Sequence, residues 1–360
     1  MSETVAAEVF RVARESIDVL PAPFDAVVAE ARSQRRRRRR TVLVSVVAGV
    51  LVVAGVAWAA SRPAERAPES RWTVTREPNP ADVAWYAGGR LHLARVAIDT
   101  PPVADLATVA DGAAFTTRAG TVYFAGADGT VTEIGSAGPG GRIEASDQTD
   151  WVAWVDPSDG VPRLVLHNLV SGKDFATLDL PDGGTVIAVD QAHVYYATPA
   201  GEFRWGPDED AVRLDRTGLL DAKAGVLVYA TDDGIEMTQA VYNSSVVRPG
   251  VGARISPTGG VVLSAAGSAD PPFRPLLYAV RSGDPKRSGL TGGELALDAT
   301  FGPNHTVSYL IVPRADLAAG PDLDGNPDPL VVLRTCDLDP VVCHDVLPLA
   351  RPGERPVLAH

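Results

Sequence analysis

The sequence predicts a mainly β protein: a β-propeller of about seven four-stranded blades, preceded by one transmembrane helix and a short helical tail. Three observations support this. Short apolar runs recur along most of the chain, with Gly, Pro and Asp between them. Residues 41–60 contain no charge, and a run of arginines comes directly before them.

The apolar runs show the repeat. They begin at Val83, Val122, Val152, Val194, Val226, Val261 and Val307. A turn signal and a second apolar strand follow most of them, as where Gly88-Gly89 precedes Leu91. A period near about 40 residues with three or four strands is typical of propeller blades. Seven runs indicate seven blades, and six or eight remain alternatives. Trp72–Thr75 is expected to pair into the last blade and close the ring, which would protect its sheet edges.

Residues 41–60 predict the membrane span. A helix of this length covers roughly 30 Å, the thickness of the hydrocarbon layer, and it would be apolar on every face. A cleaved signal peptide is the alternative, because Ala57-Trp58-Ala59 resembles a cleavage site. The long leader and the long apolar stretch favour an uncleaved anchor.

An arginine run sets the orientation of this span. Its members are Arg35, Arg36, Arg37, Arg38, Arg39 and Arg40. Positive residues stay on the cytosolic side and attract anionic lipid headgroups. We therefore expect a cell-membrane protein with residues 1–40 in the cytosol as a tail. Residues 41–60 form the span, 61–80 a proline-rich extracytoplasmic linker and 81–358 the propeller.

The charge balance differs between the two sides. Residues 1–40 hold nine arginines and six acids, a net +3, so the rest of the chain carries −12 − 3 = −15. This composition argues against nucleic-acid binding. Residues 1–32 predict two short helices, broken at Pro21 and Pro23. They either lie on the inner leaflet or form a docking peptide for a cytosolic protein.

Two motifs resemble known propellers. Ile255-Ser256-Pro257-Thr258-Gly259-Gly260-Val261-Val262 resembles the turn and strand of TolB-like and WD40-like bacterial propellers, with Thr258 in place of the usual Asp. Leu169-Val170-Ser171-Gly172-Lys173 resembles an outer turn of the same repeats. The tail is similar in layout to membrane proteins paired with extracytoplasmic-function sigma factors, although it lacks the His and Cys of one zinc-binding anti-sigma class. These resemblances imply the fold and leave the function open.

Cys336 and Cys343 are the only cysteines. They flank Asp339-Pro340 between two predicted strands, 331–335 and 344–347. In an exported domain the expected state is a disulfide. A metal site would need further ligands beyond the neighbouring His344.

One loop resembles a calcium-binding sequence. Oxygen-bearing side chains alternate at Asp322, Asp324, Asn326 and Asp328, as in Ca²⁺ loops. Leu333 stands where such a loop has its bidentate Glu, so an ordinary polar turn is the alternative. No other cofactor is predicted.

No catalytic motif is apparent, so we expect a protein that is not an enzyme. The first functional hypothesis is an extracytoplasmic binding or scaffold module for an envelope protein, peptide or glycan. The second is a transmembrane signalling regulator whose propeller senses and whose tail binds a cytosolic factor.

Overall fold

The computed structural model describes residues 72–239, 244–303, 305–313, 331–348 and 356–360. They belong to one compact unit, Ser70–His360, and all their regular elements are β-strands. No described helix is long and apolar enough to cross a membrane. The predicted tail, arginine run and span lie outside the described residues.

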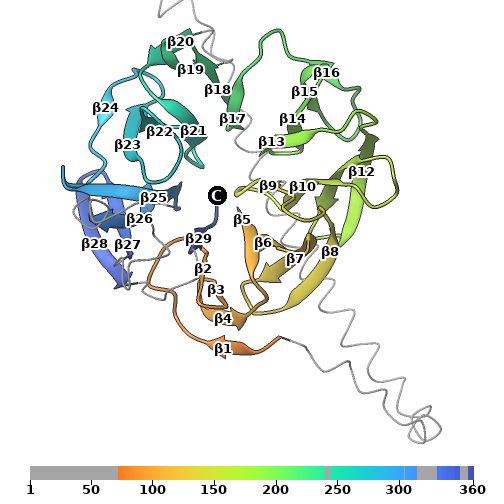
Figure 1. The fold of residues 1–360 in the computed structure, drawn as a ribbon, viewed down its shortest axis with the longest axis horizontal. Coiled ribbons are helices and arrows are strands. Elements are labelled where there is room, and N and C mark those ends of the chain that lie inside the picture. Colours follow the sequence, from red (N-terminus) through yellow and green to blue (C-terminus); the bar gives the residue numbers. More distant parts are fainter. Residues whose placement is uncertain (1–71, 240–243, 304, 314–330, 349–355) are drawn as a thin grey trace, which may run out of the picture. The chain divides into compact units, whose positions relative to one another are not determined.

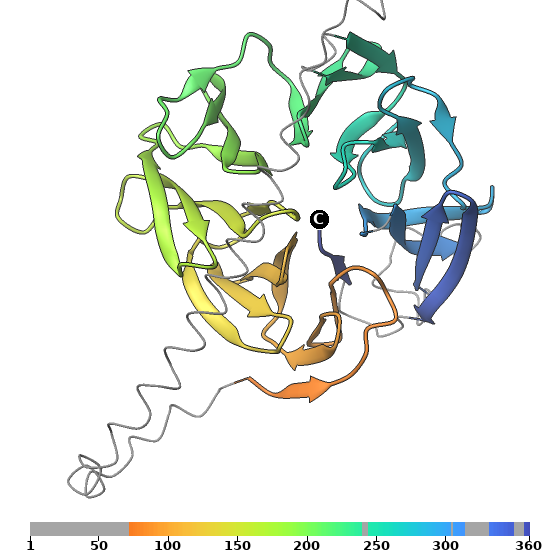
Figure 2. The same cartoon turned by 180° about the vertical axis from the view of Figure 1, so that it is seen from behind.

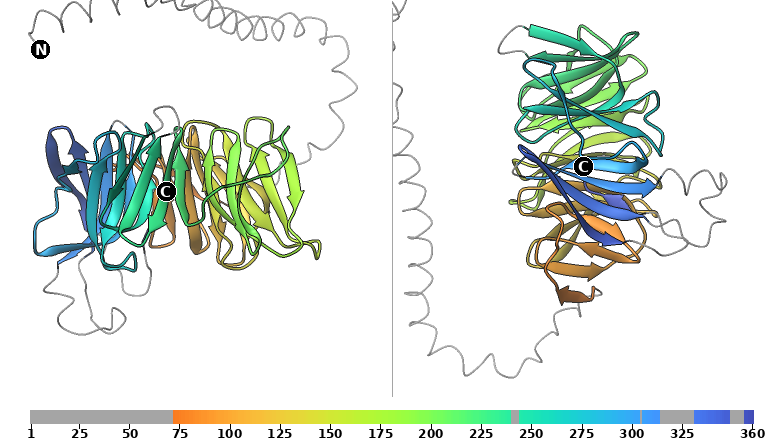
Figure 3. Two further views of the ribbon diagram at one scale, coloured as in Figure 1. Left: turned by 90° about the horizontal axis from the view of Figure 1, so that it is seen from above. Right: turned by 90° about the vertical axis from the view of Figure 1, so that its left-hand side faces the viewer.

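Seven antiparallel sheets stand around a common axis, which makes the unit a seven-bladed β-propeller (Figures 1 and 2). In blades 2 to 7 the first strand in sequence lies nearest the axis and the others follow outward. Seen from the side, the strands run between two opposite faces on which the turns lie (Figure 3). This arrangement confirms the predicted mainly β propeller and its seven blades.

Blade 1 combines the two ends of the described chain. From the axis outward its strands are β29 (Val357–Leu358), β2 (Trp85–Ala87), β3 (Arg90–His92), β4 (Val96–Asp99) and β1 (Val74–Arg76).

Blades 2 to 4 are four-stranded. Blade 2 contains β5 (Val103–Val109), β6 (Gly112–Thr117), β7 (Thr121–Gly126) and β8 (Val131–Ser136). Blade 3 contains β9 (Ile143–Ala145), β10 (Trp151–Asp156), β11 (Arg163–Asn168) and β12 (Lys173–Asp179). Blade 4 contains β13 (Thr185–Asp190), β14 (His193–Thr198), β15 (Gly201–Trp205) and β16 (Val212–Arg213).

Blades 5 to 7 repeat the pattern. Blade 5 contains β17 (Leu219–Lys223), β18 (Val226–Thr231), β19 (Gly234–Gln239) and β20 (Ser244–Arg248). Blade 6 contains β21 (Val251–Ile255), β22 (Val261–Ala266), β23 (Arg274–Ala279) and β24 (Pro285–Lys286). Blade 7 contains β25 (Glu294–Phe301), β26 (Thr306–Pro313), β27 (Val332–Leu338) and β28 (Val341–Pro348).

The predicted boundaries of the repeat were wrong by one or two strands. The apolar runs are the second strands of six blades and, at Val122, the third strand of blade 2. The second strand is buried on both faces between neighbouring blades, so it is the most uniformly apolar. Several first strands, among them β5, β17 and β25, interrupt their apolar residues with an Asp and were therefore missed.

The predicted ring closure was also wrong. β1 pairs with β4 at the outer edge of blade 1, and the ring is closed by β29, which pairs with β2 through Trp85 opposite Leu358. A strand from the far end of the chain thus completes the first blade, and its Leu358 N–H bonds to Asp298 of blade 7.

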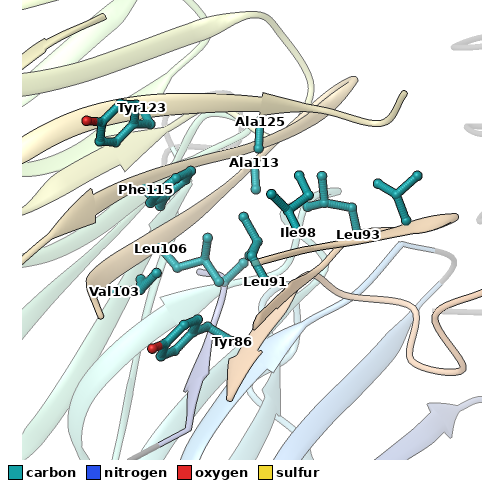
Figure 4. Close-up of a cluster of buried hydrophobic side chains, with 12 residues drawn as sticks. Tyr86, Leu91, Leu93, Ile98, Val103, Leu106, Ala113, Phe115, Tyr123 and Ala125 are labelled. Atoms are coloured by element: carbon teal, nitrogen blue, oxygen red, sulfur yellow. The ribbon is translucent and has the colours of Figure 1, made fainter. Parts of the chain in front are cut away.

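The hydrophobic core consists of seven clusters, one between each pair of neighbouring blades. In the cluster between blades 1 and 2, Leu91 and Ile98 face Leu106 and Phe115 (Figure 4). All four side chains are fully buried. Because each blade has an apolar surface on both sides, it is stable only with a neighbour on each, and the closed ring provides one.

Candidate functional site

The innermost strands surround a cavity of about 910 Å³ at the axis of the ring. All seven blades contribute to its wall. Small aliphatic side chains make up much of this wall, and charged or titratable groups interrupt them. These groups are Asp82, Asp111, Arg142, Glu144, Asp147, Glu202, Asp221, Lys223, Arg254 and His360.

Aspartates on three innermost strands join neighbouring blades. Asp105, Asp221 and Asp298 each directly follow a β-bulge, in β5, β17 and β25. Oδ2 of Asp105 accepts a hydrogen bond from the Ile143 N–H of blade 3 at 3.0 Å. Oδ2 of Asp221 likewise accepts the Ile255 N–H of blade 6 at 2.6 Å, and Asp298 does the same toward blade 1. A bulge redirects the side chain, so it can reach the next blade.

Glu202 performs the same task between blades 4 and 5. Its two carboxylate oxygens accept the N–H groups of Gly218 and Leu219, each at 2.9 Å. Arg254 also bonds to the next blade, but as a donor: its Nη1 donates a hydrogen bond to the Ala299 carbonyl at 2.7 Å. Much of the charge around the axis therefore holds blades together.

The last four residues connect several blades. The Ala359 N–H donates to the Ala84 carbonyl of blade 1 at 2.9 Å. His360 forms backbone hydrogen bonds with Leu106 and Thr108 of blade 2, at 3.1 and 2.8 Å. Its imidazole Nε2 lies 3.0 Å from the Ile143 carbonyl of blade 3. His360 thus forms part of the cavity wall. Figure 1 shows the C-terminal end of the chain at the centre of the ring.

Glu144 of the wall lies among several charged and titratable groups. Burial raises the pKa of its carboxyl, while His360 and Arg142 lower it and the nearby charges of Asp105 and Asp221 raise it further. Its Oε2 lies 3.5 Å from His360 Nε2, and its Oε1 lies 3.3 Å from Arg142 Nη2. Burial also raises the pKa of Asp221. In both cases burial acts in this direction because a charged carboxylate is poorly solvated there.

Two contacts join blade 3 to more distant blades. Lys223 Nζ of blade 5 lies 3.2 Å from Asp147 Oδ2. The Gln148 amide donates to the Pro257 carbonyl of blade 6. Asp82 and Asp111, by contrast, are exposed and form no ion pair with another described residue. The cavity wall therefore contains both charged groups held by neighbouring blades and two exposed carboxylates, Asp82 and Asp111.

The two faces of the ring differ in charge. The first, here called the acidic face, carries the described turns 77–84, 93–95, 110–111, 127–130, 146–150, 169–172, 191–192, 206–211, 224–225, 256–260, 280–284, 302–303, 305 and 339–340. They contain eleven carboxylates and two arginines, giving −11 + 2 = −9. The described turns of the opposite face contain six carboxylates and four arginines, giving −6 + 4 = −2.

The predicted disulfide is present. Cys336 and Cys343 are directly opposite each other on β27 and β28, with Cα atoms 4.0 Å apart. Both strands extend further than expected, so the bond lies within the hairpin ladder and not across its loop. Cys336 is fully buried, and Gly289 packs against the two sulfur atoms. The bond lies in the outer half of blade 7, away from the cavity.

The other predicted site residues are not tested. Asp322, Asp324, Asn326 and Asp328 lie outside the described residues, as do Arg35 to Arg40. Within the described ranges no three His, Cys, Asp or Glu side chains are grouped to hold a metal ion. The bulge aspartates were missed, although Leu-Asp-Ala at 220–222 and again at 297–299 was a signal that could have revealed them.

No protein-family description matches this chain, and no curated protein sequence matches it. Among solved structures, Kluyveromyces lactis Hsv2 is similar at 13% identity with a TM-score of 0.44, over 66% of this chain and 75% of that one. The β-propeller domain of Cps50 (Swd1) from Myceliophteria thermophila is similar at 12% identity and 0.45, over 75% and 90%.

TolB from Acinetobacter baumannii is similar at 13% identity with a TM-score of 0.39, over 66% of this chain and 62% of that one. At these values the propeller assignment rests on the strand pairing of the chain itself. None of the similarities assigns a function to it.

Proposed function

We propose that this chain is a non-enzymatic binding or scaffold module of a bacterial cell envelope, held to the membrane by residues 41–60 with the propeller outside. The observation that supports a binding function is that carboxylates around the axis hold neighbouring blades together. Asp105, Asp221, Asp298 and Glu202 are committed to backbone N–H groups of neighbouring blades. Such a ring is a rigid support, and its turns and cavity are available for recognition.

Two further observations support placement outside the cytosol. The Cys336–Cys343 disulfide is typical of exported proteins, because cytosolic thiols are kept reduced. The sequence of residues 35–60 combines an arginine run with an uncharged stretch long enough to span a bilayer.

The competing proposal is a transmembrane regulator whose residues 1–32 bind a cytosolic factor. The observation that favours it is the apolar spacing within these residues, which suits a docking helix. The two proposals differ in where the specific partner binds.

Crosslinked co-purification tests both. Full-length protein and a variant without residues 1–32 are recovered from crosslinked cells, and bound proteins are identified by mass spectrometry. Equal recovery of envelope proteins with both chains is the result expected of a binding module. A cytosolic transcription factor recovered only with the full-length chain would instead support the regulator.

A further inference from the structure

Blade 3 exposes an apolar patch at the acidic face. Val170, in the turn between β11 and β12, is 78% exposed, and Phe175 of β12 is 55% exposed. The Phe175 ring meets Trp151 edge-on, with ring centroids 5.0 Å apart. Trp151 directly follows turn 146–150. We call Trp151, Val170 and Phe175 the blade 3 patch.

A local irregularity turns Phe175 outward. Leu166 pairs with Ala176, and His167 pairs with Asp174, so Phe175 between them has no partner on β11. The imidazole Nδ1 of His167 lies 2.8 Å from Asp174 Oδ1, which holds this end of the strand. A bulge of this kind changes the direction of a side chain. The exposure of Phe175 is therefore built into the backbone of the hairpin.

Three carboxylates lie on the same face of the ring as the patch. Asp150 precedes Trp151, and turn 206–211 of blade 4 contributes Asp208 and Asp210. These three form no ion pair with another described residue. Turn 206–211 follows Trp205, which belongs to the same hydrophobic cluster that Trp151 packs against. The apolar patch and the free carboxylates therefore share one region of the acidic face.

We propose that this region docks a basic segment of a partner protein that also carries an exposed apolar side chain. The inference rests on the proposed binding function and specifies its partner. Lys or Arg side chains would meet the carboxylates, which favour a cationic partner. The apolar side chain would cover the blade 3 patch, since exposed apolar surface is a common mark of interaction sites.

A direct binding assay tests the apolar part. Full-length protein in a neutral maltoside detergent is titrated into fluorescein-labelled Lys-Lys-Phe-Lys-Lys, and anisotropy is measured. Replacing Val170 and Phe175 together by Ser is expected to weaken binding about tenfold. The matched control is Val161→Ser, an equally apolar, 45% exposed site in the same blade at the opposite face. Equal weakening by the control, or none by either variant, would overturn the proposal.

A second pair of variants tests the charge. Asp208→Asn with Asp210→Asn is expected to weaken binding about threefold at low salt and to flatten its salt dependence. Asp232→Asn with Asp233→Asn makes the same change on the opposite face and should have no effect. Glu-Glu-Phe-Glu-Glu should not bind. Binding of both peptides alike would contradict electrostatic selection.

The crosslinking experiment separates this inference from the proposed function. Envelope proteins recovered with the natural chain but lost with the Val170 and Phe175 variant support both. Equal recovery with the variant leaves the binding module standing and rejects the blade 3 patch. Recovery of no envelope protein with either chain rejects the binding module itself.

Discussion

Glu144 illustrates how single residues of the cavity wall are set by their surroundings. Its carboxyl lies among Arg142, His360, Asp105 and Asp221, and burial raises its pKa above the ordinary value. A raised pKa means that the folded protein binds the proton more tightly than the unfolded chain. Its contribution to stability is then fully present below the unfolded pKa and is lost as pH rises through the folded pKa.

The effect of Glu144→Gln on the free energy of unfolding is therefore expected to depend on pH. The variant keeps a neutral side chain at every pH, so relative to the natural protein its free energy of unfolding should increase as pH rises from the unfolded pKa through the folded pKa, and then stay level. Urea unfolding between about pH 4 and pH 8 measures this difference. A difference that stays constant across the series would show that Glu144 does not titrate as described.

Gly289 lies at a position that only glycine can occupy without strain. Its φ is +81°, and an added Cβ would meet both sulfur atoms of the disulfide. Gly289→Ala should lower the free energy of unfolding by about 2 to 4 kcal/mol through backbone strain and overpacking. Gly292→Ala, which has open space around it, is the control and should have little effect. Thermal or urea unfolding provides the comparison.

Among the elements, the short strand β29 and the residues after it form hydrogen bonds with several blades. It completes blade 1, and the two residues after it bond to blades 1, 2 and 3. The Leu358 N–H also donates to Asp298 Oδ2 of blade 7 at 3.3 Å. Four blades therefore depend on one segment, whereas a typical inner strand contacts its own blade and its two neighbours.

Removal of residues 357–360 is expected to destabilise the whole ring. The loss of several backbone hydrogen bonds and of the buried Leu358 amounts to about 5 to 8 kcal/mol, comparable to the total stability of many domains. Proteolysis and circular dichroism would show unfolding. His360→Ala, which keeps the backbone bonds, should cost about 1 kcal/mol. A truncated chain as stable as the natural one would contradict closure by β29.

In the whole molecule, the residues that hold the ring together differ from those that are exposed for binding. Inter-blade clusters and axial carboxylates hold the blades, while the turn faces carry exposed charge and apolar side chains. Over the described turns the net charge is −9 on the acidic face and −2 on the opposite face. The two faces therefore differ in electrostatic potential, which the strand topology alone does not show. A positively charged partner would meet one face preferentially.

The proposed membrane attachment makes a prediction about the whole chain. Full-length protein should remain in the membrane pellet after alkaline carbonate extraction, because a spanning helix is effectively irreversible. A variant lacking residues 41–60 should appear in the soluble fraction. In cells that carry the full-length chain, protease added outside should cleave the propeller and leave residues 1–40 protected by the membrane. Release of the full-length chain by carbonate would reject the anchor.

Local sequence patterns were enough to predict a mainly β propeller of about seven blades and the pairing of the two cysteines. These depend on local patterns: apolar runs such as Val194–Ala197, turn residues such as Gly88-Gly89, and only two cysteines to pair. Strand formation and turn formation are short-range, so they can be read along the chain.

Three features became clear only from the three-dimensional structure: the strand that begins each blade, the way the ring closes and the role of the axial carboxylates. Val357–Leu358 carries almost no local strand signal, and its role comes from pairing with Trp85 at the other end of the domain. Asp221 looks like a turn residue until the bulge of β17 directs it to the Ile255 N–H. Both depend on contacts between residues distant in sequence, which a local pattern does not contain.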